Sequence, residues 1–383
     1  MDFTLSEEHQ MIRDICRKFA DKELKPIAAE YNRKHIFPMA QVKKLGEMGI
    51  MGIVYPEEYN GAGMDYISYV IAVEEISRGG ASTGVTVSAH NSLCLSPIYY
   101  FGTEEQKKKY LPRLCTGEHI GCFGITEPGA GSDASGTITR AERKNGKWVL
   151  NGSKTFITNG GVADVAVVMA KTAINSDHRG LSMFIIEKSS PGFLVGKAEG
   201  KMGLLSSSTT ELIFDNCEIP EENLLGEEGQ GFKIAMHTLD GGRVGIAAQA
   251  LGISQAAMED AIAYAKERKQ FNKSISDFQA IQWMIADMAT DIEAARLMTY
   301  QAADLMNGDN RQKYSKQAAM AKLFASEASH RVTHKALQIL GGYGYTTEYP
   351  MERYCRDARI TEIYEGTSEI MRLVIASNIL RSF

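Results

Sequence analysis

The sequence predicts an α+β protein built from three consecutive regions. Helical periodicity dominates residues 1–118 and 226–383, whereas 119–225 holds short β-rich runs separated by Asn-Gly, Pro-Gly and Gly-Gly turns. A chain of 383 residues is long enough for two or three domains with sizeable cores. We therefore expect an N-terminal helical domain (1–118), a middle β domain resembling a barrel or orthogonal sheet (119–225) and a C-terminal four-helix bundle (226–383).

The N-terminal region is predicted to be all-helical. Apolar residues from Met11 to Phe19 recur at helical spacing, which predicts a helix over 5–31 with Thr4 or Ser6 as its cap. Further helices are expected at about 38–48, 66–78 and 103–116. The apolar run 88–102 indicates a buried helix that ends at Gly102.

The middle region contains four β-rich runs, KWVLNGSKTFITNGG (147–161), ADVAVVMAK (163–171), GLSMFIIEKSSPGFLVG (180–196) and STTELIFDNCEIP (208–220). Their close spacing favours a compact β domain over βαβ units. After Gly226 the pattern is helical again, over 231–268, 277–305, 313–340 and about 368–381. Long helices of this kind typically pack antiparallel into a bundle.

The composition excludes several classes of function. The net charge of -5, with no long Lys/Arg run, argues against nucleic acid or an anionic membrane as the main partner. No window approaches the ~18 uninterrupted apolar residues of a spanning helix, and the N-terminus does not resemble a signal peptide. We expect a bacterial cytoplasmic protein, although a processed mitochondrial-matrix chain would have the same features.

No metal site is expected from the sequence. The six cysteines are scattered and form no CxxC pair, so they are predicted to be reduced thiols, mostly buried. His330 and His334 are four residues apart and could share a helix face, but no third ligand is evident.

Two segments of the middle region could border a ligand. CFGITEPGAGSDASG (122–136) matches neither GxGxxG nor GxxxxGK[ST], so its simplest interpretation is a turn between strands. The hydroxyls of Thr126 and Ser132 beside glycines would nevertheless suit a closely approaching ligand. KTFITNGG (154–161) is either a core strand or the border of a planar ring, formed by Phe156 and Thr158.

Three segments of the C-terminal region have the same ambiguity. A Gly-Gly pair in TLDGGRVGIAAQALGI (238–253) costs about 1 kcal/mol per glycine in a helix, which close packing or room for a bulky ligand would explain. Arg243 beside it is a salt-bridging residue or an anion contact. ERKQFNKSISDFQ (267–279) could hold a phosphate or be a solvated helix end, and Gly341 and Gly342 of QILGGYGY (338–345) are C-cap candidates.

The segment RDARITEIYEGTSEI (356–370) carries four carboxylates, on Asp357, Glu362, Glu365 and Glu369. Asp357 lies between two arginines and is expected to form an ion pair, and Glu362 has no evident special role. Gly366 interrupts the helical pattern, and the following hydroxyls resemble the cap of a new helix with Glu369 in its first turn. Glu365 alone falls at this junction, so it is the local candidate for a catalytic base.

Taken in order, these motifs closely resemble those of the acyl-CoA dehydrogenase family of flavoproteins. The resemblance extends over essentially the whole chain and rests on ITEPGAGSD, KTFITNGG, LDGGRVGIAAQALGI, RKQFNKSISDFQAIQ, QILGGYGY and RDARITEIYEGTSEI. It implies the family fold and FAD-dependent α,β-dehydrogenation of an acyl-CoA thioester, with the short-chain, butyryl-CoA branch most similar. In other branches the base precedes the arginine matching Arg243, but that position is Gly242 here, which leaves Glu365.

The resemblance also assigns binding residues. It places the flavin against Phe123, Ile125, Thr126, Ser132, Phe156, Ile157 and Thr158, and the diphosphate or adenosine end against Thr367, Ser368 and Glu369. It places the FAD of a neighbouring subunit against Arg268, Phe271, Gln279, Gln338, Gly341 and Gly342. Acyl-CoA would contact Ser132, Asp240, Gly241, Gly242, Arg243, Tyr364 and Gly366, with the thioester oxygen bonded by the flavin ribityl chain and the Glu365 N–H.

The implied assembly is a homotetramer, a dimer of dimers, that passes electrons to an electron-transferring flavoprotein. Two alternatives belong to the same family: a branched or cyclic acyl-CoA as substrate, or enoyl-CoA reduction with an electron-bifurcating partner. A third is a flavin- or acyl-CoA-binding scaffold without catalysis, against which the intact Glu365 argues. The sequence does not specify chain length or the side chains that close the acyl pocket.

Overall fold

The computed structural model describes residues 4–173, 178–308 and 314–381. Its N-terminal region is helical, as expected, with α1 (Glu7–Phe19), α2 (Lys25–Lys34), α3 (Met39–Glu47), α4 (Tyr66–Gly79), α5 (Ala81–Ala89), α6 (Ser96–Phe101) and α7 (Glu104–Cys115). Ser6 caps α1 by accepting the His9 N–H at 3.1 Å, which confirms one of the two predicted caps. The predicted helix over 5–31 contains a π-helical turn, Ala20–Leu24, between α1 and α2.

The helix expected over 88–102 is divided. A π-helical segment, His90–Leu95, joins α5 to α6, and the last turn ends at Gly102 as predicted. Its residues are buried, including the polar side chains of His90 and Asn91. Asn91 donates to the carbonyls of Ile50 and Val87, which satisfies buried groups where the helical ladder widens.

In the part of the middle region that the structure describes, the strands form one eight-stranded sheet. Its strands are β1 (Gly121–Gly124), β2 (Arg140–Lys144), β3 (Lys147–Thr158), β4 (Val165–Lys171), β5 (Leu181–Glu187), β6 (Phe193–Ala198), β7 (Thr209–Pro220) and β8 (Leu224–Leu225). The order is β6-β7-β3-β2-β4-β5-β8, with β1 paired to β4. The pairs are antiparallel except β1–β4 and β2–β4, and only a 3-10 turn and a hairpin join β1 to β4, so the expectation of no βαβ unit is confirmed.

A register shift in β3 exposes one aromatic ring. Opposite β7, the pairing of β3 slips between Lys154 and Ile157. Phe156 lies in this irregularity at φ 59° with 63% of its surface exposed, while Ile157 is buried in the sheet core. A bulge of this kind redirects a side chain that a regular strand would bury or pair.

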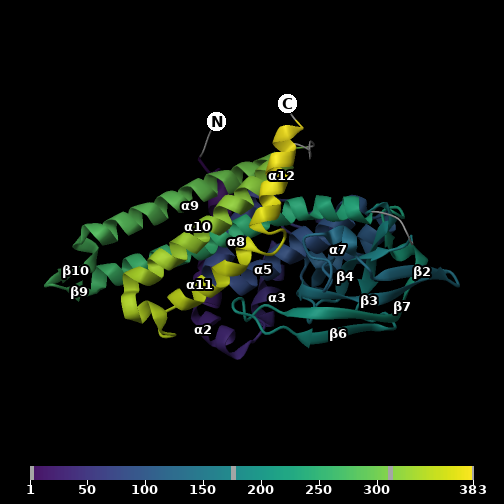
Figure 1. Cartoon of the computed structure of the whole chain (residues 1–383), viewed down its shortest axis with the longest axis horizontal. Helices are drawn as coiled ribbons and strands as arrows, with labels where there is room; N and C mark the ends of the chain where they lie inside the picture. Colours follow the sequence, from purple (N-terminus) through teal and green to yellow (C-terminus); the bar gives the residue numbers. More distant parts are fainter. Residues whose placement is uncertain (1–3, 174–177, 309–313, 382–383) are drawn as a thin grey trace.

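The C-terminal region is dominated by three long helices, α8 (Gly231–Glu267), α9 (Gln279–Met306) and α10 (Ser315–Leu340). They run side by side in Figure 1, with the hairpin β9 (Lys269–Gln270) and β10 (Lys273–Ser274) at one tip and the sheet towards the opposite end of the molecule. Two helices follow, α11 (Met351–Arg359), which the sequence analysis did not specify, and α12 (Ser368–Leu380). Residue 313, the expected start of the third helix, lies outside the described residues.

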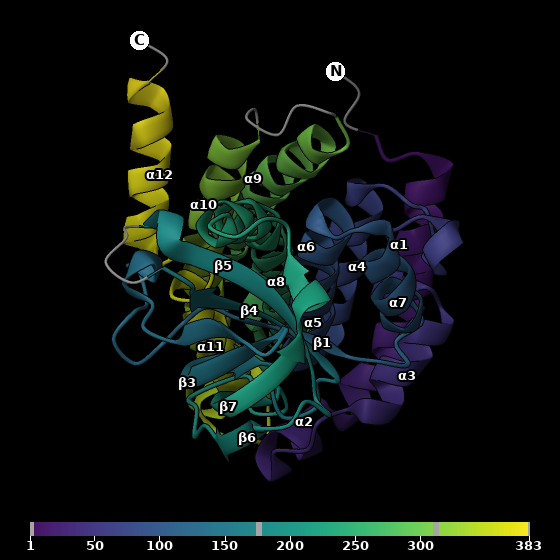
Figure 2. The same ribbon diagram turned by 90° about the vertical axis from the view of Figure 1, so that its right-hand side faces the viewer.

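The N-terminal and C-terminal helices share a core. Residues of α4 and α5 and the middle of α8 belong to one buried cluster, in which α4 is covered almost all round. Figure 2 shows α4, α5 and α8 adjacent, beside the sheet. Within the described residues, no helix combines the length and apolarity needed to cross a bilayer.

Candidate active site

Glu365 lies in a left-handed turn between the 3-10 segment Ile360–Glu362 and α12. Its φ is 52° and that of Gly366 is 101°. Thr367 then caps α12, and its side chain accepts the Ile370 N–H at 3.3 Å. The left-handed region costs a non-glycine residue about 1–2 kcal/mol, so surrounding contacts must hold Glu365 in place.

The Glu365 carboxylate faces the Gly-Gly pair of α8. A Cβ placed on Gly242 would collide with Glu365 Oε2 and lie 2.8 Å from Leu93 Cδ2. Oε2 is buried and has no hydrogen-bond partner among the described residues. A buried carboxylate oxygen without a donor is unfavourable for structure alone, which is typical of a group that acts on a ligand.

The pKa of Glu365 is raised to about 7 by burial, against the opposing influence of the cations Lys322 and Arg243. Lys322 extends from α10, and its Nζ donates to the Gly366 carbonyl at 2.6 Å. Burial lowers the pKa of Lys322 to about 8, partly offset by Glu365. A carboxylate with a pKa near neutrality is poised both to accept and to release a proton.

The other three carboxylates have structural environments. Asp357 differs from the expected arginine ion pair, because it is buried and accepts the Leu204 N–H at 2.6 Å, while Arg356 pairs with Glu352. Glu362 pairs with Arg359. Glu369 is exposed in the first turn of α12, as predicted. Glu365 is therefore the carboxylate of this segment that lacks a structural partner for Oε2.

A polar cluster on α8 adjoins Glu365. Asp240 accepts from Arg243 Nη1 at 2.5 Å and from Ser315 at 3.0 Å, while Arg243 is only 5% exposed. Burial raises the pKa of Asp240, and Arg243 opposes this rise. The Nε of Arg243 has no partner among the described residues, so this buried guanidinium retains a donor for a ligand.

The two middle-region segments predicted to border the flavin are held together. Thr155 N–H donates to the Thr126 carbonyl at 2.9 Å, and Lys154 Nζ donates to the Ile125 carbonyl at 3.2 Å. Lys154 also pairs with Glu127 at 2.6 Å, and both side chains are almost fully buried. Burial lowers the pKa of Lys154 to about 8 despite the opposing effect of Glu127.

The predicted flavin residues differ in exposure. Phe123 and Ile157 are buried, Ile125, Thr126 and Thr158 are half-buried, and Ser132 and Phe156 are exposed. Leu93, whose side chain lies beside Gly242, belongs to the same hydrophobic cluster as Phe123, with Ile125 packed against it. One apolar cluster therefore extends from the neighbourhood of Gly242 to the predicted flavin residues Phe123 and Ile125.

The start of α12 adds an unpaired donor. Ser368 Oγ is buried and has no hydrogen-bond partner among the described residues. A helix start also offers free N–H groups to an anion, although Thr367 already accepts one of them. Together these groups suit the diphosphate expected here.

A second group of predicted residues lies elsewhere. Arg268, Gly341 and Gly342 border a hollow of about 530 Å³ at the hairpin end of the bundle, where Arg268 lies 5.8 Å over the Tyr343 ring. Phe271 in the hairpin is 87% exposed, and Gln279 and Gln338 are exposed at the helix ends nearby. In Figure 1 this end is remote from α12 of the same chain. The structure therefore does not join this group to Glu365 within one subunit.

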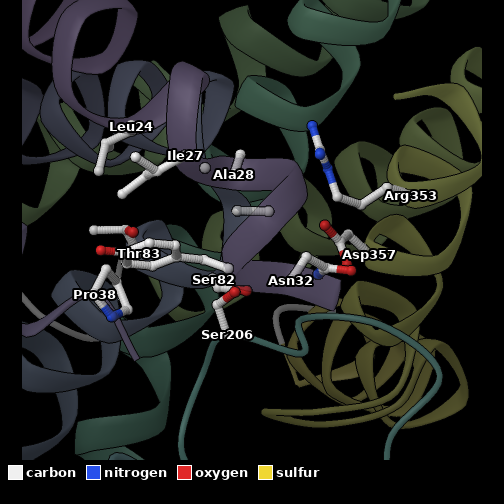
Figure 3. A pocket seen from close by; sticks show the side chains of 13 residues that line it. Leu24, Ile27, Ala28, Asn32, Pro38, Ser82, Thr83, Ser206, Arg353 and Asp357 are labelled. Atoms are coloured by element: carbon white, nitrogen blue, oxygen red, sulfur yellow. The ribbon is translucent and has the colours of Figure 1, made fainter. Parts of the chain in front are cut away.

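A small cavity between α2, α5 and α11 is distinct from both groups (Figure 3). It is lined by residues that include Asn32, Ser82, Ser206, Arg353 and Asp357, and its volume is about 30 Å³. That is room for one or two water molecules, far less than a nucleotide needs. The pKa of Asp357, which points into it, is raised to about 6 by burial.

Three residues of the site were missed by the sequence analysis. Lys322 lies on the buried face of α10 among alanines, and a lysine in an otherwise apolar stripe was the signal that could have revealed it. Gln249 accepts a hydrogen bond from Tyr364 OH. Lys154, inside the KTFITNGG motif, supports the loop that carries Thr126.

Comparisons with known proteins agree with this architecture. Three family models match the chain: "Acyl-CoA dehydrogenase, N-terminal domain" over residues 6–118, "middle domain" over 122–217 and "C-terminal domain" over 229–380. The mitochondrial short-chain specific acyl-CoA dehydrogenase of Rattus norvegicus is 54% identical over 379 residues, which cover 99% of this chain and 92% of the rat protein.

Two solved structures superpose over the entire chain. One is butyryl-CoA dehydrogenase from Megasphaera elsdenii, at 47% identity and a TM-score of 0.97, with 100% of each chain covered. The other comes from a study of the electron-transferring flavoprotein of Acidaminococcus fermentans and flavin-based electron bifurcation, at 56% identity, a TM-score of 0.97 and 100% coverage of each chain. The chain therefore belongs to the acyl-CoA dehydrogenase family, whose members are FAD-dependent oxidoreductases.

Proposed function

We propose that this protein catalyses the α,β-dehydrogenation of a short-chain acyl-CoA, butyryl-CoA to crotonyl-CoA, with Glu365 as the base. The observation that carries the proposal is the buried Oε2 of Glu365, which has no partner among the described residues and faces Gly242. The similarity to butyryl-CoA dehydrogenase and to the rat short-chain enzyme supports the choice of substrate.

Glu365 would accept the α-proton of the thioester. The pKa of that proton is far above that of a carboxylic acid. The raised pKa of Glu365, about 7, makes the difference between the two pKa values smaller. As the proton moves to the carboxylate, a hydride leaves the β-carbon with both electrons of its C–H bond, and the carbon–carbon double bond forms. FAD, when bound, supplies the acceptor for this hydride.

The backbone beside the base has a matching role. The N–H of Glu365 lies in the left-handed turn and donates to no backbone carbonyl among the described residues. We propose that it donates to the thioester oxygen, where negative charge develops as the α-proton leaves. Arg243, with its free Nε, and Asp240 would contact the CoA portion of the substrate.

The chain's residues fit the flavin cofactor. The exposed ring of Phe156, the half-buried Thr126 and Thr158 and the open surroundings of Gly129 and Gly131 leave room for a planar group against the loop. The buried Ser368 Oγ at the start of α12 would donate to a phosphate oxygen. The proposed flavin surface also includes Phe123, Ile125, Ser132 and Ile157. Glu369, next to Ser368, would belong to the diphosphate or adenosine end of the cofactor site.

The remote group at the hairpin would hold the FAD of a neighbouring subunit. Acyl-CoA dehydrogenases are tetramers, and a homotetramer brings such surfaces together. Arg268, with its guanidinium over the Tyr343 ring, would meet a phosphate or adenine, and Gly341 would allow close approach of the backbone. Phe271, Gln279, Gln338 and Gly342 complete this surface. The assembled enzyme would pass electrons to an electron-transferring flavoprotein in a bacterial cytoplasm or, as for the rat relative, a mitochondrion.

Anaerobic titration of the FAD-loaded protein with butyryl-CoA tests the proposal. Flavin absorbance should bleach with butyryl-CoA and respond more weakly to C6, C8 and isobutyryl thioesters, since each methylene in a pocket changes binding by about 1–3 kcal/mol. Glu365→Gln should bind crotonyl-CoA as the native protein does yet reduce its flavin at least about 100-fold more slowly. Retained reduction by this variant would refute the role of Glu365, and an unchanged native spectrum would refute the substrate.

A second function has one observation in its favour. The similar chain from the Acidaminococcus fermentans study appears in the context of flavin-based electron bifurcation. The same site would then work in the direction of enoyl-CoA reduction, with Glu365 returning its proton to the α-carbon. Crotonyl-CoA reduction by a reduced partner flavoprotein, faster than butyryl-CoA oxidation under matched conditions, would favour this direction.

A further inference from the structure

Lys322 is buried at a position where a lysine is costly. It is fully inaccessible in the middle of α10, on a face formed by residues such as Ala318, Ala321 and Ala325. An ammonium group removed from water loses several kcal/mol of hydration unless polar partners replace it. A neutral side chain would fill this apolar stripe without any loss of ammonium hydration. The groups that Lys322 contacts therefore indicate why a lysine is present here.

One partner is the turn that carries Glu365. Lys322 Nζ donates to the Gly366 carbonyl at 2.6 Å, a short charge-assisted bond. This carbonyl directly follows Glu365, and both residues have positive φ, 52° and 101°. The bond therefore ties the strained turn to the rigid helix α10, which fixes the backbone from which the Glu365 side chain extends.

The second partner is the charge of Glu365 itself. Glu365 is faced by Lys322 from α10, Arg243 from α8, the phenol of Tyr69 from α4 and its neighbour Tyr364. The positive charge of Arg243 is offset by Asp240, with which it pairs at 2.5 Å. Lys322 forms no ion pair with a carboxylate among the described residues, so its charge is not offset by direct contact.

The other charged groups near Lys322 influence its pKa less than Glu365 does. Glu362 and Glu369 attract it and Arg243 repels it, but Glu365 is the strongest charged influence on its pKa. Glu362 is already paired with Arg359, and Glu369 is exposed to solvent. Among the charged groups, Glu365 therefore has the largest influence on the pKa of Lys322, and Lys322 on that of Glu365.

We propose that Lys322 is a positioning residue for proton abstraction: it fixes the left-handed turn that presents Glu365 and supplies a positive charge that favours the ionised form of its carboxylate. The inference rests on the proposed role of Glu365 as the base. In Lys322→Met both effects are lost, so a larger fraction of Glu365 is protonated at neutral pH. In Lys322→Gln the donor to Gly366 can persist while the charge is lost, which separates the two effects.

The central measurement is the rate of flavin reduction by butyryl-CoA as a function of pH. An opposite charge nearby typically lowers a carboxyl pKa by about one to three units, so the pH profile of both variants should move upward by about that amount. Near pH 7 the rate should fall about fivefold or more, and it should recover towards the native value at high pH. Lys322→Arg should retain most of the native profile.

A second measurement requires neither substrate nor flavin. Infrared difference titration of the apoprotein, with Glu365→Gln as the reference, follows the carboxyl stretch of Glu365 directly. Its midpoint should rise in Lys322→Met and Lys322→Gln. The matched control is Lys335→Met on the same helix, because Lys335 pairs with Asp287 outside the site and its removal should leave the midpoint unchanged.

The outcomes separate the inference from the proposed function. A native pH profile and a native infrared midpoint in both Lys322 variants would overturn the inference, as would a rate loss that is equal at every pH. If Lys322→Met fails to fold, Lys322→Gln and Lys322→Arg carry the same test. Flavin reduction that persists in Glu365→Gln would instead refute Glu365 as the base, whatever the Lys322 variants do.

Discussion

Gly242 of α8 and the carboxylate of Glu365 are in direct contact. A side chain at position 242 would force the Glu365 carboxylate to move, because its Cβ would overlap Glu365 Oε2 and approach Leu93 at 2.8 Å. The adjacent Gly241 differs, since a Cβ there would meet only Met306 Cε at an ordinary 3.5 Å. The two glycines of the pair are therefore not equivalent, although both weaken the helix by about 1 kcal/mol relative to alanine.

Gly242→Ala should displace the Glu365 carboxylate, whereas Gly241→Ala should not. We expect Gly242→Ala to slow flavin reduction by about tenfold to 100-fold, because a displacement of about 1 Å in a catalytic group can have that effect. Gly241→Ala should instead raise thermal stability, by up to about 1 kcal/mol. Melting temperature and the infrared midpoint of Glu365 measure the difference; equal shifts of that midpoint in both variants would contradict the contact.

Glu365 should make the protein less stable as the pH rises. Its pKa is about 7 when folded, above the ordinary glutamate value of 4.5, so the folded state binds more protons between those values. Its contribution is favourable below about pH 4.5 and is lost progressively as the pH rises through about 7. Glu365→Gln should therefore melt at a higher temperature than the native apoprotein at pH 8. The difference should shrink towards pH 5, and a difference independent of pH would count against the raised pKa.

The buried pair of Lys154 and Glu127 should be essential for the loop that carries Ile125 and Thr126. Lys154→Met leaves Glu127 buried without its cation, a change that typically costs about 3–5 kcal/mol. Urea unfolding should show this loss, together with lower FAD content, because Lys154 also holds the Ile125 carbonyl. The double variant Lys154→Met/Glu127→Gln removes the unpaired charge and should recover part of the stability. Loss in the double variant equal to that in the single one would argue against an electrostatic cause.

Arg268→Ala should weaken FAD retention without changing the fold of the subunit. Arg268 is exposed at the end of α8 and lies over the Tyr343 ring, so its removal leaves no buried charge behind. The ratio of flavin to protein after gel filtration should fall, while far-UV circular dichroism stays native. Lys266→Ala, an exposed cation two residues earlier in the last turn of α8, is the control and should retain its flavin. A native flavin ratio in Arg268→Ala would remove this residue from the proposed cofactor surface.

Much of the fold followed from periodicity and turn signals. The predicted helix over 66–78 is α4 almost to the residue, because Asp65 caps it and Gly80 ends it. The four β-rich runs all form strands of the sheet. The π-helical turns at Ala20–Leu24 and His90–Leu95 were not predicted, because such turns are rare and occur inside an otherwise α-helical pattern.

The candidate site, like the fold, could be predicted from the sequence only in part. Glu365 could be selected from the sequence because Gly366 and the cap residue Thr367 indicate a break in the helical pattern. Lys322 could not be assigned a role in the same way, because the carbonyl that it binds is 44 positions away and no motif links the two segments. The interpretation of Asp357 as an ion-pairing residue differed from the structure because its partner, the Leu204 N–H, also comes from a distant loop.

Helix α8 also sets the distance between Gly242 and Arg268. Gly242 and Arg268 are separated by about 39 Å along its axis at 1.5 Å per residue, so a single cofactor molecule of one subunit cannot extend from one to the other. An inserted residue between them would rotate everything beyond it by about 100° as well as lengthening the helix. Glu365 would keep its contact with Gly242, whereas the surface around Arg268 would turn to face another direction. Natural variants of this chain should therefore tolerate substitutions along α8 far better than changes in its length.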